Sequence, residues 1–324
     1  MSAITAIALF SFLLVPFVWS QTVTYIPGEL PLILSVPHGG ALKPVEFPDR
    51  HYGCFIDNEC VFEQDCTPQS SSCKVSTLKD AFTRDIGMAV SDFIFRETEL
   101  HPYVVINELH RIKLDANREI NEVTLNNPNA IAAFNEYNQR VEEAINSINA
   151  RALFIDIHGQ THPENWVELG YRLSSNELNT GTLPKEKCSI RRLQEDSCGS
   201  NVTCSYLYIS GQHSLGAYLE STSEEYSVVP SPENESPGSG NYFAGGYNTD
   251  TYGSDMLGVT DAIQVEIPRP IRFSEDGFDR NLFAEQLGKS LLEFLEDNGY
   301  LGDSPCSFDI QERATSSPSV SRCW

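Results

Sequence analysis

The stretch ALFIDIHGQTHP, residues 152–163, decides the fold. Asp156 is the one polar residue in an apolar run that ends at His158 and Gly159. A short, nearly continuous apolar run predicts a buried strand rather than an amphipathic helix. Such strands belong to α/β sheets, in which ligands bind beyond the carboxyl ends of the strands. We therefore expect His158 at a sheet edge that could hold a site, with Asp156 on the same face to orient a neighbouring ligand.

Taken alone, His158 is about as consistent with a core histidine bonded to a backbone carbonyl. A second segment of the same build, LILSVPHGG (residues 32–40), shifts the balance. It is again an apolar run that stops at a histidine followed by glycine, His38 and Gly39. This repetition favours a functional site at the ends of two buried strands.

The first twenty residues predict a secretory signal peptide, because they contain no charged side chain and an apolar core followed by small residues. The mature chain is expected to start near Gln21. An uncleaved membrane anchor is less favoured, because the apolar stretch is short for a span, and no other segment could cross a bilayer.

All nine cysteines follow residue 20, which suits an oxidising compartment and disulfides. No pair has the CxxC spacing of a zinc ribbon or a thioredoxin-like site, and an odd number leaves at least one cysteine unpaired within the chain. Asn201 and Asn234 begin glycosylation sequons. Together these features predict a secreted, extracellular glycoprotein.

The net charge is −23, from 22 basic and 45 acidic residues. Such a surface repels nucleic acid and anionic membranes. It could attract cations such as calcium, but no EF-hand spacing of carboxylates is present, and solubility is the usual explanation of such a charge.

Strands and helices alternate along the chain, which predicts an α/β fold with a mainly parallel or mixed sheet in one domain spanning residues 21–324. Long polar loops are expected at 41–77, 176–204 and 221–255, the first two stapled by disulfides whose pairing the sequence leaves open, and a loop-like tail from about residue 302. The expected strands are 22–26, 31–37, 103–107, the run from 152, 205–209 and 260–267, and the expected helices are 77–97, 128–151 and 278–298.

The residues that carry chemistry lie at the expected strand ends. His38, His158 and Glu266 are accompanied by the pair Asn117 and Arg118. Two imidazoles and a carboxylate can hold zinc and leave one position open, and a further carboxylate can act as general base on the activated water. The planar fork of arginine suits a substrate carboxylate.

Six blocks between about residues 31 and 280 carry a resemblance, and they occur in the same order in the family concerned. They are SVPHGG (35–40), DAFTRDIG (80–87), ELHRIKLDANRE (108–119), FIDIHGQTHP (154–163), GGYNTDTYG (245–253) and AIQVEIPRPIR (262–272). In these blocks the chain resembles the N-formylglutamate amidohydrolase family. The resemblance implies a three-layer α/β, zinc-carboxypeptidase-like fold with disulfide-stapled loop insertions.

The resemblance also implies roles for individual residues. His38 and His158 match two zinc ligands, and Glu266 matches the catalytic carboxylate. Asn117 and Arg118 match a pair that holds the substrate carboxylate, and Arg111 is a candidate second anion-binding arginine.

The third zinc ligand is less certain. Zinc carboxypeptidases have a glutamate three residues after the first histidine, where this chain has Ala41. Asp80 is the expected ligand, with Asp85 and Glu108 as alternatives.

Each role has a structural alternative. Asp80 could be a helix N-cap, and Arg118 could form a solvated pair with Glu119. Glu266 is harder to explain in this way, because an unpaired carboxylate inside an apolar strand is costly. A serine hydrolase is not favoured, since no Gly-x-Ser-x-Gly elbow is present.

The sequence thus predicts a secreted, zinc-dependent hydrolase of an amide bond adjacent to a carboxylate. Its substrate would be a small N-formyl or N-acyl amino acid, or the C-terminus of a peptide. The alternative is a non-catalytic acidic extracellular protein on a hydrolase scaffold, which binds calcium or associates with a matrix. The charge, Ala41 and the stapled insertions motivate this alternative, and calcium binding without zinc would favour it.

Overall fold

The computed structural model describes residues 21–56, 59–61, 72–199, 201–254, 258 and 260–302. The expected signal peptide, residues 1–20, and the tail from residue 303 lie outside the described residues. In the part that is described, no helix has both the length and the apolar character that a membrane span requires.

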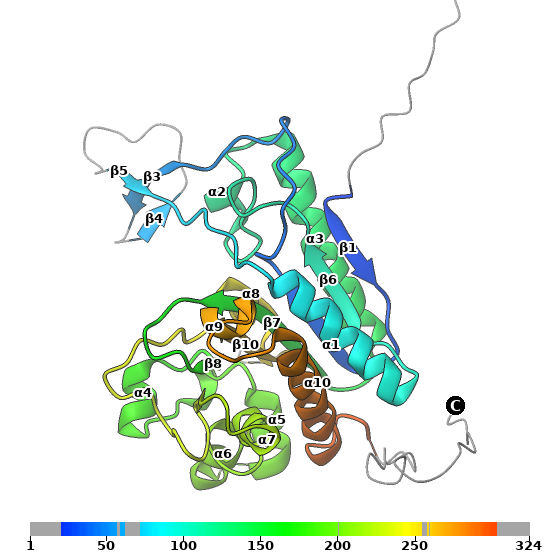
Figure 1. Ribbon diagram of the computed structural model, residues 1–324, viewed down its shortest axis with the longest axis vertical. Coiled ribbons are helices and arrows are strands. Elements are labelled where there is room, and N and C mark those ends of the chain that lie inside the picture. Colours follow the sequence, from blue (N-terminus) through cyan, green and yellow to red (C-terminus); the bar gives the residue numbers. More distant parts are fainter. Residues whose placement is uncertain are drawn as a thin grey trace, which may run out of the picture.

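A seven-stranded sheet forms the centre of the molecule (Figure 1). Its strands lie in the order β1-β6-β2-β7-β10-β8-β9, so neighbours in space are mostly distant in sequence. Four of the six pairings are parallel, and the pairs β1–β6 and β10–β8 are antiparallel. The predicted mixed, mainly parallel sheet is confirmed. The strand bounds are β1 Val23–Ile26, β2 Leu32–Val36, β6 Tyr103–Asn107, β7 Ala152–Gln160, β8 Val167–Gly170, β9 Val228–Val229 and β10 Thr260–Pro268.

Helices cover both faces of the sheet. Successive residues of a strand point to opposite faces, and here both faces are apolar and form separate cores. In β2, Leu32 and Leu34 belong to the larger core, whereas Ile33 packs in the opposite one. Helices α1 and α10 pack against each other in the larger core, and α3 covers the other face (Figure 1). The result is the expected three-layer arrangement. These helices span α1 Thr83–Thr98, α3 Pro128–Ser147 and α10 Arg280–Asp297.

The remaining helices are short and occupy the connections. Several of them, from the stretch between β8 and β10, gather near β8 (Figure 1). All the short helices together are α2 Ile120–Val123, α4 Ser175–Thr180, the 3-10 helix η1 Lys185–Lys187, α5 Arg191–Cys198, α6 Val202–Ile209, α7 Leu215–Thr222, α8 Tyr247–Tyr252 and α9 Arg269–Phe273.

The first long connection is more ordered than the sequence indicated. It contains a separate three-stranded antiparallel sheet in the order β4-β3-β5, formed by β3 Tyr52–Ile56, β4 Glu59–Val61 and β5 Ser72–Lys74. A disulfide between Cys60 and Cys73 joins its two outer strands. The expectation of a disulfide-stapled insertion is therefore confirmed here.

Three sequence-based assignments were wrong. The segment 176–204 was expected to be a long loop, but most of it forms α4, η1 and α5. Residues 205–209 were expected to form a strand, but they belong to helix α6, which packs against α5 and α7. An apolar run of five residues fits either state, and the packing decides. The helix expected from residue 77 begins only at Thr83, because the preceding residues run in an irregular segment that carries Asp80.

The four central strands bring the candidate residues together. Strands β6, β2, β7 and β10 are mutually parallel, so their carboxyl ends meet at one edge of the sheet. His158 lies opposite Glu266 in the β7–β10 register, and Ser35 lies opposite Asp156 in the β2–β7 register. A site at this edge follows from the topology alone.

Candidate functional site

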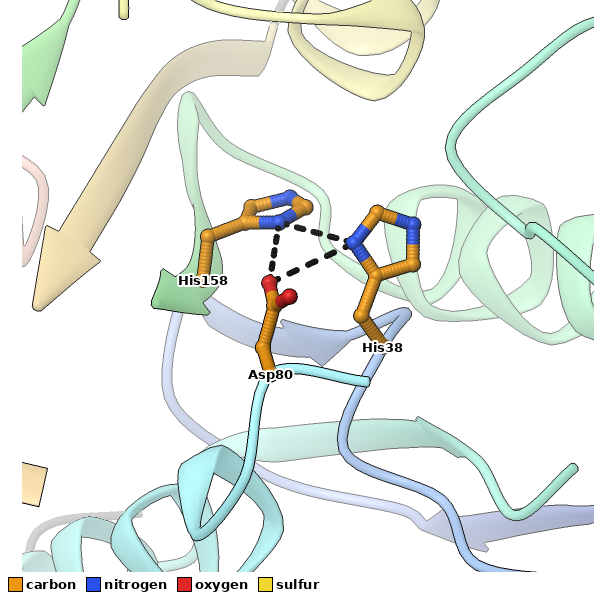
Figure 2. A group of neighbouring side chains, drawn as sticks. All are labelled: His38, Asp80 and His158. Atoms are coloured by element: carbon orange, nitrogen blue, oxygen red, sulfur yellow. Dashed lines mark hydrogen bonds and ion pairs between the residues drawn. The ribbon is translucent and has the colours of Figure 1, made fainter. Parts of the chain in front are cut away.

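The side chains of His38, Asp80 and His158 converge at the carboxyl edge of the sheet (Figure 2). The two imidazole Nδ1 atoms are 3.1 Å apart. The Asp80 Oδ2 atom lies 3.1 Å from Nδ1 of His158 and 3.4 Å from Nδ1 of His38. All three residues are buried, so this group could hold a metal ion with little competition from water.

Three separate segments supply the group. His38 follows β2 by two residues, His158 lies near the end of β7, and Asp80 precedes α1. The Asp80 backbone N–H donates to the His38 carbonyl at 3.0 Å, which joins two of these segments directly. The N-cap of α1 is Phe82, so the alternative role of Asp80 as a helix cap is wrong.

The far side of each imidazole ring contacts a buried carboxylate. Nε2 of His38 lies 2.6 Å from Asp115, and Nε2 of His158 lies 2.8 Å from Asp156. A carboxylate accepts hydrogen bonds, so each Nε2 carries the proton and donates it. Both Nδ1 atoms are thereby directed, as acceptors, toward each other and toward Asp80.

This donor set fits a metal ion. Two imidazole lone pairs and a carboxylate oxygen at 3.1–3.4 Å repel one another unless a proton or a cation lies among them. Zinc–nitrogen bonds of about 2.0–2.1 Å place two ligands of a tetrahedral site about 3.3 Å apart. The observed separations match that spacing, and nitrogen and carboxylate ligands suit zinc.

The glycine after each histidine has a steric reason. A Cβ on Gly39 would lie 2.6 Å from the backbone nitrogen of Arg84 at the start of α1. A Cβ on Gly159 would lie 2.3 Å from Nε of Arg272. The histidine-glycine repeat therefore reflects two places where another segment lies directly against the strand end.

Glu266 lies beside this group on β10 and is 5% exposed. Its Oε1 accepts a hydrogen bond from Gln264 Nε2 at 3.0 Å. Burial raises the pKa of Glu266 to about 8, and the charges of Asp80 and Glu168 add to this effect while His158 opposes it. A carboxyl group with such a pKa can hold or release a proton near neutral pH.

Charges within the group shift the pKa values of Asp80 and His158. Burial opposes the ionisation of Asp80, but its contacts with His38 and His158 hold its pKa well below the usual range. Burial also opposes the charged form of His158, but Asp156 and Asp80 raise its pKa well above the ordinary value. Without a metal, His158 is therefore the member that carries a proton between the acceptors.

Asp115 was missed as a site residue, although it lies within the polar block 108–119 of the sequence. Its second oxygen accepts from Nε of Arg111 at 2.9 Å and lies 3.7 Å from Nη1 of Arg50. Arg50 also donates to the Arg111 carbonyl at 2.8 Å. The available signal was the four-residue spacing of Arg111 and Asp115, which allows an ion pair, but the link to His38 requires the fold.

The predicted substrate-binding residues differ in their surroundings. Nδ2 of Asn117 lies 3.1 Å from Nε2 of His158, and its Oδ1 accepts from the Asn248 backbone at 2.8 Å. Arg111 is engaged by Asp115, and its Nη1 lies 3.6 Å from Asp80. Both residues lie against the metal group, and their expected roles in substrate binding stay predictions.

Arg118 is exposed and, among the described residues, forms no ion pair. Its Nη1 donates to the carbonyl of Asn117 at 2.8 Å. It lines a cavity of about 570 Å³ beside the site, together with Asp115, Arg50, Arg172, Gly246 and Tyr247. Carboxylates also line this cavity, and Arg50 lies beside Asp115 while Arg172 pairs with Asp250. Arg118 is therefore the lining arginine that suits an anionic group of a ligand.

The alternative third ligands do not join the group. Asp85 is exposed on the first turn of α1. Glu108 accepts from Nε of Arg84 at 2.9 Å and from Oγ1 of Thr24 at 2.6 Å. The structure therefore brings Asp80, rather than either alternative, to the two histidines.

Neither predicted glycosylation site belongs to the group formed by His38, Asp80 and His158. Asn201 is exposed between α5 and α6. Asn234 is half-buried, and its backbone N–H donates to Oγ of Ser231 at 3.0 Å. Their glycosylation stays a prediction.

No family model and no curated protein sequence matches this chain. Among solved structures, the N-formylglutamate amidohydrolase from Ralstonia eutropha JMP134 is similar, with 14% identity and a TM-score of 0.42, over 87% of this chain and 98% of that one. The CwlD amidase from Clostridioides difficile, in complex with the GerS lipoprotein, is similar with 11% identity and a TM-score of 0.31, over 82% of this chain and 98% of that one. At these identities and TM-scores, neither similarity assigns an activity to this chain.

Proposed function

We propose that this chain is a zinc-dependent hydrolase of an amide bond adjacent to a carboxylate. The observation that carries the proposal is the convergence of three acceptor atoms, from His38, Asp80 and His158, beside a buried carboxyl group whose pKa is raised to about 8. A structural cluster would not need both features at one sheet edge.

His38, Asp80 and His158 would hold the zinc ion. When bound, zinc supplies Lewis-acid chemistry, because it polarises a carbonyl oxygen and lowers the pKa of a water molecule. The protein orients its own ligands through Asp115 and Asp156, which hold the two rings in the tautomer that leaves Nδ1 available.

Glu266 would move the proton in the reaction. Its carboxylate accepts a proton from the attacking water and then delivers it to the leaving nitrogen, so one group acts as base and then as acid. Burial and the adjacent carboxylates raise the pKa of Glu266, which makes its carboxylate a stronger base for the first transfer, and a cation beside Glu266 would favour the ionised form that this transfer needs.

Arg118 would bind the substrate carboxylate. Its guanidinium lines the cavity and, within the described part of the chain, has no competing carboxylate partner. A charge-assisted, two-pronged contact would place the neighbouring amide bond near the metal group. N-formyl amino acids, N-acyl amino acids and peptide C-termini all have this arrangement.

We also propose that the protein is secreted and glycosylated at Asn201 and Asn234. The support is the sequence of residues 1–20, the cysteine usage and the disulfide between Cys60 and Cys73. Mass spectrometry of protein secreted from eukaryotic cells, before and after enzymatic deglycosylation, tests both statements.

The deciding experiment combines metal content with hydrolysis. Elemental analysis of the purified mature protein is expected to give about one zinc per chain, and His158→Ala is expected to lose it. Glu266→Gln is expected to keep the zinc and to lose hydrolysis of N-acyl amino acids or peptides by a factor of 10² or more.

The outcomes are distinct. Full activity in Glu266→Gln would overturn the proposed proton transfer. A wild-type protein that takes up no zinc even from excess metal would overturn the hydrolase, and a calcium-dependent rise in melting temperature would then favour the acidic scaffold protein.

A further inference from the structure

Arg272 is a buried arginine on α9, the helix that follows β10, and it is 3% exposed. Its guanidinium donates three hydrogen bonds, all to backbone carbonyls. Nε donates to Ile267 at 2.9 Å, Nη1 to Ala81 at 2.8 Å and Nη2 to Gln160 at 2.9 Å.

Each of these carbonyls lies next to a residue of the site in sequence. Ala81 follows Asp80, and Ile267 follows Glu266. Gln160 ends β7 two residues after His158. One planar fork thus joins the three segments that carry Asp80, His158 and Glu266.

Arg272 forms no ion pair with any carboxylate of the described residues. The carboxylates whose charges act on it are Asp80 and Glu266. Apart from the Phe273 ring, whose centroid lies 5.7 Å from Cζ, the guanidinium is satisfied by carbonyls, and a buried cation without an ion pair is costly to keep. The arrangement therefore needs a reason beyond stability, and the charges of two acidic residues of the site supply one.

Gly159 makes room for this fork. A Cβ at Gly159 would lie 2.3 Å from Nε and 2.6 Å from Cζ of Arg272. The backbone N–H of the same glycine donates to Oδ2 of Asp80 at 3.1 Å. The residue after His158 therefore contacts both Arg272 and the carboxylate proposed as the third ligand.

We propose that Arg272 is a positioning residue of the metal centre, which fixes Asp80, His158 and Glu266 relative to one another through three backbone carbonyls. The inference rests on the proposed function for the roles of those three residues. It assigns no contact with substrate to Arg272.

The test compares Arg272→Lys with Arg269→Lys. Lysine keeps the charge but cannot reproduce a three-pronged planar fork. Arg269 is the matched control, because it lies on the same helix, is exposed and pairs with Glu275 at 2.8 Å. Circular dichroism and thermal unfolding first establish that both variants fold.

Zinc affinity, measured by competition with a chromophoric chelator, is expected to fall 10–100-fold in Arg272→Lys and to stay unchanged in Arg269→Lys. The visible absorption of the cobalt-substituted protein is expected to change only in Arg272→Lys. The kcat of Arg272→Lys is expected to fall about 10-fold or more with KM within about two-fold, since positioning acts on the reacting groups and not on substrate binding. Wild-type affinity, cobalt spectrum and kcat in Arg272→Lys would overturn the inference.

If Arg272→Lys does not fold, Gly159→Ala replaces it as the test variant. The added Cβ displaces the Arg272 guanidinium without removing it. The same losses are expected in this variant, and wild-type zinc affinity would overturn the inference.

Metal-free protein separates this inference from the proposed function. If the wild type binds neither zinc nor cobalt, the proposed function fails, and amide hydrogen exchange decides the role of Arg272. Exchange at the Gly159 amide, which donates to Oδ2 of Asp80 across two of the joined segments, is then expected to be at least 10-fold faster in Arg272→Lys than in Arg269→Lys. Equal exchange rates would overturn the inference.

Discussion

The two imidazoles of the metal group each donate a hydrogen bond to a carboxylate, and the two carboxylates differ in their other hydrogen-bond partners. Asp115, behind His38, accepts from Arg111 at 2.9 Å and lies 3.7 Å from Arg50. Asp156, behind His158, accepts from neutral groups, namely Ser35 Oγ at 2.6 Å and Asn248 Nδ2 at 3.2 Å. The negative charge of Asp115 is thus partly neutralised by two arginines. Among the residues described, no arginine lies beside Asp156, and its negative charge acts mainly on His158.

This difference assigns different tasks to two similar contacts. Although burial opposes ionisation, Arg111 and His38 hold the pKa of Asp115 well below its ordinary value. Asp115 therefore mainly neutralises buried cations. Asp156 mainly raises the basicity of His158, whose pKa lies well above the ordinary value. We expect the first contact to matter most for stability and the second for metal affinity.

The largest loss of unfolding free energy is expected for Asp115→Asn. The change leaves the buried guanidiniums of Arg50 and Arg111 without their shared anion, which should cost about 3–5 kcal/mol of unfolding free energy. Urea unfolding of the metal-free protein measures it. Asp156→Asn leaves no guanidinium without an anion, and the protonated His158 keeps its contact with Asp80, so this variant should cost about 1–2 kcal/mol in the same assay. Equal losses in the two variants would contradict the distinction.

Metal affinity should show the reverse order. Asp156→Asn is expected to weaken zinc binding about 10–100-fold, equivalent to about 1.4–2.8 kcal/mol, because His158 loses the charge that makes it a strong donor. Competition with a chelator at fixed pH measures the change. A smaller loss than that of a folded Asp115→Asn would refute the proposed division of tasks.

The pH dependence of stability sharpens the comparison further. The folded-state pKa of His158 is raised, so its stabilising contribution is complete below about pH 6.5 and is lost as the pH rises through the folded pKa. Glu266 acts in the same direction, because its pKa is raised from 4.5 to about 8 and the folded state resists its ionisation between those values.

Metal-free protein should therefore lose stability from pH 4.5 to about 8 through Glu266, and above pH 6.5 through His158 as well, with each group contributing at most about 1.4 kcal/mol per pH unit. Urea unfolding at successive pH values, in the presence of a chelator, measures the slope. Asp156→Asn should flatten the slope by removing the His158 contribution, and Glu266→Gln should remove the other. A wild-type stability that rises with pH in this window would rule out both assignments.

The smallest effect is expected for the carboxylate that the structure leaves outside the group. Asp85→Asn changes an exposed side chain and should alter zinc affinity and stability by less than about 0.5 kcal/mol. The chelator competition and urea assays apply again. A large loss of zinc in this variant would mean that the third ligand had been misassigned.

Periodicity predicted the sheet and the strand-end residues because apolar runs fix where buried strands stop. His38, His158 and Glu266 could be found in this way, since parallel strands bring their carboxyl ends to one edge. The third metal ligand could be narrowed only to three candidates, Asp80, Asp85 and Glu108. The long connection before Asp80 has no periodicity that fixes the path of the chain. Arg272 lay within a recognised block, but its three carbonyl partners come from distant segments and cannot be read from spacing.

The connection carrying the small disulfide-bonded sheet shows the same limit. Its strands are three to five residues long, too short for an alternating pattern to stand out from a loop. Helix α6 was mistaken for a strand because an apolar run such as SYLYI satisfies both periods. Local sequence gave no means of choosing, and tertiary packing made the choice.

The wide spacing of the three ligands along the chain has a consequence for biosynthesis. The two histidines are 120 residues apart, and Asp80 and His158 are 78 apart. No short stretch of the nascent chain therefore contains the complete proposed site, and a metal ion could bind all three residues only after β2 and β7 have paired. Metal uptake would then be one of the last events in maturation, and a bound metal would report that the central sheet has formed.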